Sequence, residues 1–483
     1  MSARWAVAAL TALGGIVRFA TLDAKGFWQD EATTVLLMRA DLWDLVVNEI
    51  PRSEATPPLF YVLEWAWASV FGTGEVAMRA LPALFGTAAI PFAYLAGKEL
   101  VSRRAGVAAA ALVAVNPLLV WYSQEARAYS LLVLLSAVAL WCFARALRDP
   151  GPRTLVAWAG VSALALVTHY FAAFAFAGQA AILLARRLHN RAVWAAAAAA
   201  GAVGLALIPL AAAQAAEQRA GWIAEAPVLD RAVQLPALLL VGFESPAPIL
   251  VAGVAGLLGL GILVVLARSG LPDERRGAAI AAAVALAAAG IPLVLAIGGL
   301  DYFIYKNVIA AAVAGSVLLG AGIGASRLGI GLGAALCALS LGVVVATAWE
   351  PKYRREDWRR VADVIGEPRG PVAIAATPGE PSRETLDVYR DAEPIDRPRT
   401  LAREVVVIGA ARRPLGATEE PRTPRPSRAP SPPAGGFRLV QRHDDDLFVL
   451  FRYRARRPVR VSSEALTAMT VDDGDYRLLR IPR

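Results

Sequence analysis

Long apolar runs, separated by short polar or charged connections, fill the first 349 positions of the chain. Eleven of these runs come near the length of about 20 residues that an α-helix needs to cross a bilayer. Because the runs are continuous rather than alternating, they predict membrane-spanning helices. The runs lie at roughly 4–21, 77–97, 105–121, 128–146, 154–168, 170–186, 192–213, 247–267, 277–298, 307–325 and 328–349.

Two apolar segments do not fit a single upright crossing. The stretch from Pro57 to Phe71 has 15 residues and includes Glu64, so we expect a helix that lies at the membrane interface or packs on the bundle. The runs 154–168 and 170–186 are also short, and basic clusters lie at both of their outer ends. This arrangement predicts a hairpin that turns at residues 168–170.

The pattern changes at residue 350. The last 134 residues hold 26 of the 49 Lys and Arg residues and 21 of the 40 Asp and Glu residues, which is typical of a water-soluble domain. Apolar positions at helical spacing over 356–365 are followed by short β-type runs, so we expect a small α/β domain. The expected strands are 371–375, 404–408, 437–440 and 447–453.

We therefore predict two domains. Residues 1–349 form a polytopic α-helical membrane domain of about 11 helices, whose outer loop 22–76 carries an acidic motif. Residues 350–483 form a soluble extracytoplasmic α/β domain. Within it, residues 411–436 contain seven prolines, which predicts a disordered or polyproline-like loop rather than a site.

Composition supports this assignment and limits the chemistry. With 57% hydrophobic and 18% charged residues, the chain lies outside the range of soluble globular proteins. Two cysteines and three histidines exclude a disulfide framework and a Cys/His metal cluster, so a metal would have to bind oxygen ligands. Cys142 and Cys337 lie inside apolar runs, where cysteine is a small core residue.

The net charge of +9 looks like a nucleic-acid footprint until it is mapped along the chain. Of the 23 basic residues before position 350, 14 fall in the amino terminus and in every second connection, which the positive-inside rule places in the cytoplasm. We therefore expect no nucleic-acid partner. The connections on the opposite, outer side are 22–76, 122–127, 214–246 and 299–306, together with the tail.

Charged residues that gather at the outer helix ends are the candidates for a site, because polar residues at membrane depth are costly. The first candidates are Asp30 and Glu31 in the segment GFWQDEA, which leads into an amphipathic stretch from Ala32 to Ile50. Adjacent residues of a helix point about 100° apart, so the two carboxylates cannot share one role. Asp30 either takes a proton from an incoming hydroxyl or caps the helix that follows it.

Three further groups lie on the same side. Glu125 and Arg127, in WYSQEARAY, are either an ion pair in a solvated turn or part of a site. His169 and Tyr170 lie at the tip of the predicted hairpin, where the histidine is either structural or functional. Lys306 either extends to the interface or offers its charge to a phosphate at headgroup depth.

The order of the motifs resembles a known family. WQDEA follows the first span, and TPPLFY, FGTGEVAMRALPALFG, NPLLVWYSQEARAYSLL, THYFAAF, YKNVIAA and DWRRVADVI come after it in that order. Over roughly residues 5–365, this order is similar to that of polytopic glycosyltransferases of the C superfamily, in particular the bacterial protein-mannosyltransferase-like and aminoarabinose-transferase-like group.

The resemblance implies an integral enzyme of the bacterial cytoplasmic membrane with its site on the outer face. Such an enzyme takes a hexose or pentose from a polyprenyl-phosphate donor and moves it to a hydroxyl of a glycan, lipid or protein. Asp30 would be the catalytic base and Glu31 its acidic neighbour. Arg127, Lys306 and Asn307 would contact the donor phosphate, although Lys306 stands where this group usually has arginine and lacks its bidentate fork.

The resemblance also implies substrate contacts for a second set of residues, which are Glu125, Tyr129, His169 and Tyr170. A divalent metal stays open, with Asp30 and Glu125 as its candidate ligands, and no other cofactor is implied. The chain contains neither a phosphate-binding loop nor a dinucleotide fingerprint, and a lipid-linked donor requires neither.

Elementary chemistry agrees with this interpretation. Attack on the anomeric carbon builds positive charge on the sugar and negative charge on the departing phosphate, so a carboxylate at the acceptor and cations at the phosphate suit the reaction. A single base favours direct displacement with inversion. The alternatives are a secondary transporter or flippase of envelope precursors, for which internal repeats and polar residues at mid-membrane are typical, and a non-catalytic scaffold.

Overall fold

The computed structural model describes residues 2–350, 353, 357–410, 426, 428–471 and 475–481. The chain folds into two compact units. The first, called the helical unit below, comprises Met1–Leu22 and Ala40–Trp349. The second, called the sheet unit, comprises Asp23–Arg39 and Glu350–Arg483. The first predicted outer loop is therefore divided, with residues 23–39 belonging to the sheet unit.

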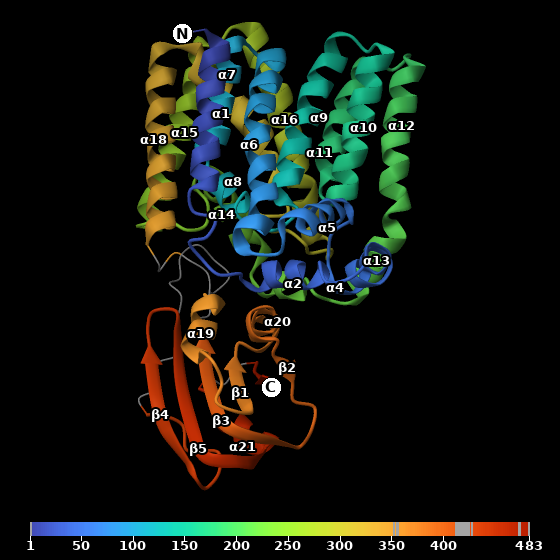
Figure 1. The fold of residues 1–483 in the computed structure, drawn as a ribbon. Coiled ribbons are helices and arrows are strands. Elements are labelled where there is room, and N and C mark those ends of the chain that lie inside the picture. The colour runs from blue at the N-terminus through green and yellow to red at the C-terminus, as the bar shows by residue number, and fades with distance from the viewer. Residues whose placement is uncertain are drawn as a thin grey trace. The chain divides into compact units, whose positions relative to one another are not determined.

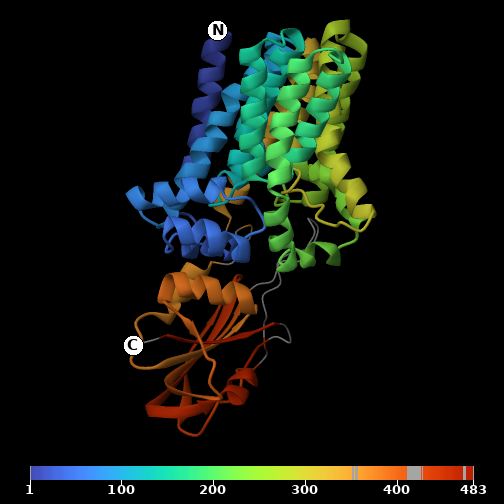
Figure 2. The same ribbon diagram turned by 90° about the vertical axis from the view of Figure 1, so that its right-hand side faces the viewer.

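Long helices lie side by side in the helical unit (Figure 1), and Figure 2 shows the same packing from the side. Three short helices, α4, α5 and α13, lie across the ends of the long ones (Figure 1), at what we call the α5 end. The elements are α1 (Ala3–Phe19), α3 (Leu42–Asp44), the π-helix η1 (Leu45–Glu49), α4 (Ile50–Ser53), α5 (Leu59–Phe71), α6 (Glu75–Leu100), α7 (Arg103–Val115), α8 (Pro117–Tyr122), α9 (Tyr129–Arg148), α10 (Pro152–Thr168), α11 (Ala172–Arg186), α12 (Arg191–Ala206), α13 (Ile208–Ala216), the 3₁₀-helix η2 (Gly221–Glu225), α14 (Val228–Val241), α15 (Pro248–Ser269), α16 (Pro272–Ile297), α17 (Ala310–Ala325) and α18 (Arg327–Trp349).

Six helical segments in the described part of the chain are long and apolar enough to cross a membrane. They are α6, α9, the α12–α13 segment, α15, α16 and α18. Four shorter apolar helices, α5, α10, α11 and α17, accompany them. The polytopic helical character is therefore confirmed, while the predicted count of eleven spans is not.

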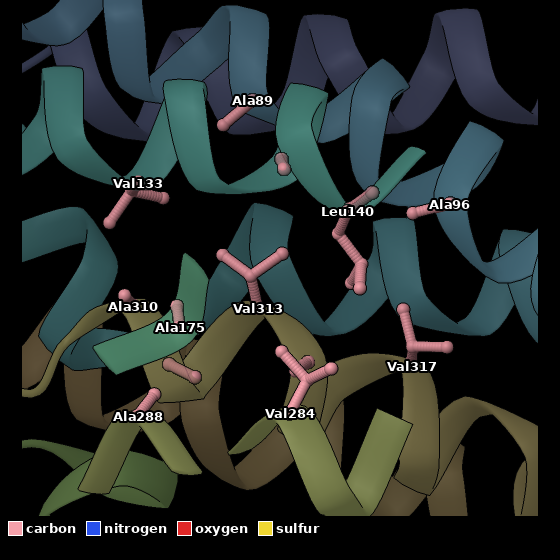
Figure 3. Close-up of a cluster of buried hydrophobic side chains, with 14 of the residues drawn as sticks. Ala89, Ala96, Val133, Leu140, Ala175, Val284, Ala288, Ala310, Val313 and Val317 are labelled. Carbon is pink, nitrogen blue, oxygen red and sulfur yellow. The ribbon is translucent and has the colours of Figure 1, made fainter. Parts of the chain in front are cut away.

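Small residues allow the helices of the unit to pack closely, as is common between helices in membranes. The cluster in Figure 3 is rich in alanine and valine, with Ala89 of α6, Ala175 of α11 and Val313 of α17 among its members. Where α6 crosses α7, a Cβ added to Gly106 would lie 2.5 Å from the carbonyl oxygen of Tyr94. Only glycine fits at this crossing.

Polar and proline residues interrupt two of the predicted runs. The run 105–121 is two helices, because the Asn116 side-chain oxygen accepts a hydrogen bond from the backbone N–H of Leu119 (3.0 Å) and Pro117 begins α8. The hairpin prediction is confirmed, since α10 ends at Thr168 and α11 begins at Ala172.

The basic connections lie together at the end of the bundle opposite the α5 end. Arg148 pairs with Glu99 at 3.1 Å between the guanidinium and the carboxylate, and Arg187 donates a hydrogen bond to the carbonyl oxygen of Leu147 (3.1 Å). Three connections that the charge pattern assigns to one side of the membrane are therefore neighbours in space.

The sheet unit contains one six-stranded sheet of strand order β2-β6-β1-β3-β5-β4. Strand β1 pairs in parallel with β3, with Ala375 opposite Val407, and the other pairs are antiparallel. The elements are α2 (Gln29–Leu37), α19 (Trp358–Ile365), β1 (Val372–Thr377), α20 (Gly379–Arg390), β2 (Glu393–Pro394), β3 (Arg399–Ala410), β4 (Phe437–Asp444), β5 (Phe448–Ser462), α21 (Ser463–Thr467) and β6 (Arg477–Ile481).

Apolar side chains cover both faces of this sheet. Trp358 of α19 and Leu386 of α20 pack on one face, while Leu466 of α21 packs on the other. The predicted helix over 356–365 and the four predicted strands are found as α19, β1, β3, β4 and β5. Most of the proline-rich segment 411–436 lies outside the described residues.

Candidate functional site

Arg127 and Glu54 form a buried ion pair at the α5 end of the helical unit. Arg127 lies between α8 and α9, and Glu54 follows α4. The guanidinium donates two parallel hydrogen bonds to the carboxylate, at 2.6 Å and 2.7 Å, and the two side chains are 10% and 2% exposed. The guanidinium carbon also lies 5.7 Å from the centre of the Tyr61 ring. This bidentate geometry holds Arg127 in one orientation.

Lys306 lies close to two aromatic rings in the same unit. Its ammonium nitrogen is 5.9 Å from the ring centre of Tyr129 and 5.1 Å from that of Trp222, within the range of cation–π attraction. The ring of Tyr129 in turn lies 5.8 Å from the ring of His169. These contacts join four residues into one group, which we call the lysine cluster: Lys306, Tyr129, His169 and Trp222.

His169 is buried between α10 and α11, outside both helices, with 2% of its surface exposed. Its Nδ1 atom accepts a hydrogen bond from the backbone N–H of Phe171 (3.2 Å), so the neutral ring carries its proton on Nε2. Among the described residues, no acceptor pairs with Nε2. Burial, together with the charges of Arg127 and Lys306, lowers the pKa of His169 to about 3, so the ring is neutral near pH 7.

The connection that carries Glu125 and Arg127 is held by α1. Arg18 of α1 is buried and donates a hydrogen bond to the Ser123 hydroxyl (3.1 Å), and the Gln124 side-chain amide donates to the carbonyl oxygen of Arg18 (3.0 Å). Glu125 is buried and accepts a hydrogen bond from the indole N–H of Trp121 (2.6 Å). The connection 122–127 is therefore a fixed part of the bundle and not a solvated turn.

Two other predicted residues are engaged elsewhere. The Tyr170 hydroxyl donates to the side-chain oxygen of Gln214 (2.7 Å), and the Asn307 amide donates to the carbonyl oxygen of Tyr302 (2.9 Å). Nothing in these contacts tests their predicted roles in binding substrate or phosphate. Asn307 supports its own loop, whereas Tyr170 links the connection between α10 and α11 to α13.

Asp301, in the loop before Lys306, forms an ion pair with Arg231 of α14. The Arg231 guanidinium donates to the Asp301 carboxylate (2.9 Å), and this hydrogen bond lowers the pKa of Asp301. Arg231 also donates to the carbonyl oxygen of Phe303. Because these bonds span residues 301–303, they hold the loop that carries Lys306 against α14.

The acidic motif lies in the sheet unit, on α2. Helix α2 begins at Gln29 with Trp28 at the N-cap, so Asp30 is in the first turn and does not cap the helix. The capping alternative is therefore wrong. Glu31 is fully buried and its carboxylate accepts a hydrogen bond from the backbone N–H of Trp28 (3.5 Å), while Asp30 is partly buried. The two carboxylates have different surroundings, as their helical spacing predicts.

The structure brings Arg127, Tyr129, His169 and Lys306 together within the helical unit. The convergence of Asp30 with them stays a prediction, because Asp30 belongs to the sheet unit. Among the described residues, no group of three or more His, Cys, Asp and Glu side chains could hold a metal ion. The metal that the sequence left open for Asp30 and Glu125 stays a prediction, because these two residues belong to different units.

Sequence reasoning missed Glu54 and Trp222. Glu54 stands three residues before the double proline of the TPPLFY motif. The only sequence feature that could have linked it to Arg127 is that both lie in connections predicted to be on the outer side. Trp222 lies in a polar connection with no recognisable pattern. The structure identifies both through tertiary contacts, since Glu54 pairs with Arg127 and Trp222 lies next to Lys306.

Fold and site together define a helical membrane protein with a buried cluster of cationic and aromatic side chains at the ends of its helices. Residues 55–212 match the family model described as dolichyl-phosphate-mannose-protein mannosyltransferase. This segment is about a third of the 483 residues and includes Arg127, Tyr129, His169 and Tyr170. The match confirms the predicted resemblance to glycosyltransferases of the C superfamily.

Solved structures of this superfamily are also similar. ArnT from Cupriavidus metallidurans bound to undecaprenyl phosphate shares 16% identity over 67% of this chain and 60% of its own, with a TM-score of 0.45. The oligosaccharyltransferase of Archaeoglobus fulgidus in complex with zinc and sulfate shares 14% over 74% and 55%, with a TM-score of 0.48. The chain thus spans 60% and 55% of the lengths of these two proteins. No curated protein matches the sequence significantly.

Proposed function

We propose that this chain is a membrane glycosyltransferase that moves a sugar from a polyprenyl-phosphate donor to an acceptor hydroxyl on the outer face of the cytoplasmic membrane. The lysine cluster carries the proposal. Lys306 supplies a positive charge, and His169 supplies a buried N–H donor with no acceptor among the described residues. A phosphate oxygen can accept a hydrogen bond from the His169 ring and is attracted by the charge of Lys306.

In the proposed reaction, the acceptor oxygen attacks the anomeric carbon of the sugar. The bond between this carbon and the acceptor oxygen forms while its bond to the phosphate oxygen breaks, and the configuration is inverted. Asp30 takes the proton of the acceptor hydroxyl. The polyprenyl phosphate leaves with the bonding electron pair, and Lys306 and His169 stabilise its charge. Arg127, held by Glu54, contributes positive potential nearby.

Other findings support the donor class. The family model that matches residues 55–212 is described by a lipid-phosphate-linked mannose donor. One similar structure holds undecaprenyl phosphate, and an oligosaccharyltransferase from Archaeoglobus fulgidus was solved with a dolichol-phosphate and an inhibitory peptide. These findings concern the donor. For the acceptor, the proposal keeps glycans, lipids and proteins open, and for the sugar it keeps hexoses and pentoses open.

Asp30→Asn tests the proposed base. The amide cannot accept the proton, so we expect transfer to fall on the order of 100- to 10,000-fold. The assay follows radiolabelled mannose from mannosyl undecaprenyl phosphate into membrane acceptors or water, with the full chain in native-like membranes. An aminoarabinosyl donor is tested in parallel.

The matched control is Asp23→Asn, which makes the same chemical change at an exposed position of the same segment and should leave transfer unchanged. Full turnover in the Asp30→Asn variant contradicts the assignment of the base. Movement of the lipid across the membrane without sugar release favours the flippase alternative.

A further inference from the structure

The segment that contains helix α2 and Asp30 contacts α20 of the sheet unit at Phe27, Thr33 and Arg39. The backbone N–H of Phe27 donates to the Tyr389 hydroxyl (2.7 Å), and the rings of these two residues stack with their centres 6.1 Å apart. The Thr33 hydroxyl donates to the Glu384 carboxylate (2.7 Å). Residues 384 and 389 are more than 340 positions away from α2 in the sequence.

The third contact lies just beyond the end of α2. Arg39 pairs with Asp387 at 2.8 Å between the guanidinium and the carboxylate, and these side chains are 50% and 36% exposed. An exposed pair of this kind contributes little to stability. The contacts at Phe27 and Thr33 bury their partners more deeply and are therefore the ones to test.

The chain that leads into α2 is also fixed within the sheet unit. Arg359 of α19 donates to the carbonyl oxygen of Asp23 (2.9 Å). Gly26 lies so close to the start of α19 that an added Cβ would be 2.7 Å from the Asp357 carboxylate and 2.9 Å from the Arg359 Cβ. The segment from Asp23 to Arg39 is thus held at its entry, on both sides of Asp30 and at its end.

We propose that α20 orients the acidic helix, and that Tyr389 and Glu384 are positioning residues for Asp30. This inference rests on the proposed role of Asp30 as the base. Asp30 is three residues from the anchored Phe27 and three from the anchored Thr33, so a rise of about 1.5 Å per residue leaves it little freedom relative to either contact. Helix α20 thereby acts in catalysis without touching the reacting atoms.

The energetic reason is the sensitivity of proton transfer to geometry. A displacement of about 1 Å at a reacting group can reduce the rate on the order of 100-fold. If Tyr389 loses its hydroxyl, the backbone N–H of Phe27 loses its acceptor, and the chain just before the N-cap of α2 is released. The position of Asp30 then changes while its chemistry does not.

The first test is Tyr389→Phe in the full-length protein, with Tyr453→Phe as the matched control. Tyr453 is in the same unit, where its ring packs on the other face of the sheet and its hydroxyl donates to the carbonyl oxygen of Pro430. Two quantities are measured: amide hydrogen exchange of residues 27–37, and the kinetics of mannose transfer from mannosyl undecaprenyl phosphate.

For Tyr389→Phe we expect faster exchange over residues 27–37 and a kcat reduced on the order of 10- to 100-fold. The KM for the donor should stay within about twofold, because the proposed phosphate contacts are in the helical unit. Tyr453→Phe should change neither quantity. A structural defect of the whole sheet unit would affect the two variants alike.

The second test uses Glu384, so that the proposal does not depend on one variant. Glu384→Gln keeps a side-chain oxygen that accepts from Thr33, and should keep most of the kcat. Glu384→Leu removes the acceptor, and should reproduce the loss seen with Tyr389→Phe.

The proposal is overturned by an unchanged kcat in both Tyr389→Phe and Glu384→Leu, by unchanged exchange over residues 27–37, or by an equal loss in Tyr453→Phe. Failure of the underlying function gives a different result. In that case Asp30→Asn keeps full transfer, while exchange in Tyr389→Phe still increases.

Discussion

At the scale of single residues, the site is built by pairing charges with groups that fix them. Glu54 holds Arg127 through both of its carboxylate oxygens, while the ammonium group of Lys306 lies near two aromatic rings. Of the two cations, Lys306 has the neighbours that suit a phosphate ligand, because the Nε2 proton of His169 lies in the same cluster. The guanidinium of Arg127 instead donates its two parallel hydrogen bonds to the carboxylate of Glu54.

Lys306→Met therefore tests the phosphate contact. Loss of a charge-assisted hydrogen bond costs about 1.5–3 kcal/mol, so we expect undecaprenyl phosphate to bind roughly 10- to 100-fold more weakly. Lys306→Arg should bind nearly as well as the parent protein. Lys98→Met is the control, since Lys98 is an exposed lysine in the last turn of α6. Binding to the protein in lipid nanodiscs measures the effect, and equal affinity in the Lys306→Met and parent proteins contradicts the contact.

His169 gives a pH dependence of known sign. Its folded-state pKa is lowered to about 3, whereas the unfolded chain titrates near 6.5. Between these values the unfolded state binds a proton that the folded state excludes, so the free energy of unfolding falls as the pH drops below about 6.5. The melting temperature should therefore fall less between neutral pH and about pH 5 in His169→Gln than in the parent protein. His189→Gln, at an exposed position, should behave like the parent.

At the scale of elements, the sequence predicts helices well where an apolar run is uninterrupted. The run 128–146 is α9 and the run 247–267 is α15, each within a few residues. It fails where a polar cap lies inside an apolar run, as at Asn116, or where short pieces follow one another, as over Ala32 to Ile50. Helix caps and prolines act on one or two residues. Their effect is hidden when hydrophobicity is judged over a whole run of about 20 residues.

The site shows the same limit. Charge counting predicted that Arg127, His169 and Lys306 share one side of the membrane domain, and the structure places them together. Choice of partner depends on tertiary contacts, so the pairing of Arg127 with Glu54 was not predictable. The attachment of α2 to α20 was also invisible, because α20 has no distinct pattern in the sequence.

Because α6 and α7 pack closely at Gly106, a larger residue at this position should destabilise the packing of these two helices. Gly106→Ala places a methyl group against the backbone of α6, and overpacking of this kind costs about 1–3 kcal/mol. Gly253→Ala is the matched control, because no atom lies within 4 Å of the added Cβ and alanine favours the helix. Thermal unfolding in detergent should show a lower melting temperature for the first variant, and an equal or higher one for the second. Similar values for both would contradict close packing at this crossing.

At the scale of the whole molecule, the sheet unit is assembled from two distant parts of the chain. Residues 23–39 come from between α1 and α3, and the remainder begins at Glu350. The contacts of Tyr389 and Glu384 with this segment are non-covalent, so they should persist when the chain is cut between the parts.

A protease site inserted near residue 354 tests this expectation. After cleavage of the folded protein in detergent, the fragment that contains the sheet should stay with an amino-terminally tagged membrane fragment, because it continues to hold residues 23–39. The double variant Tyr389→Phe, Glu384→Leu should retain less of it. Quantitative immunoblotting of the bound and unbound fractions measures the result, and complete release of the fragment from the parent protein contradicts it.

The assembly of the sheet unit from two separate parts of the chain also affects how relatives of this protein can recombine and diverge. If relatives exchange their carboxy-terminal halves by recombination, the new half meets an acidic helix that it was not selected to hold. Hybrids joined near residue 350 should therefore be impaired unless positions 23–39 come from the same parent as the half that contains α20, and these two stretches are expected to change together during divergence.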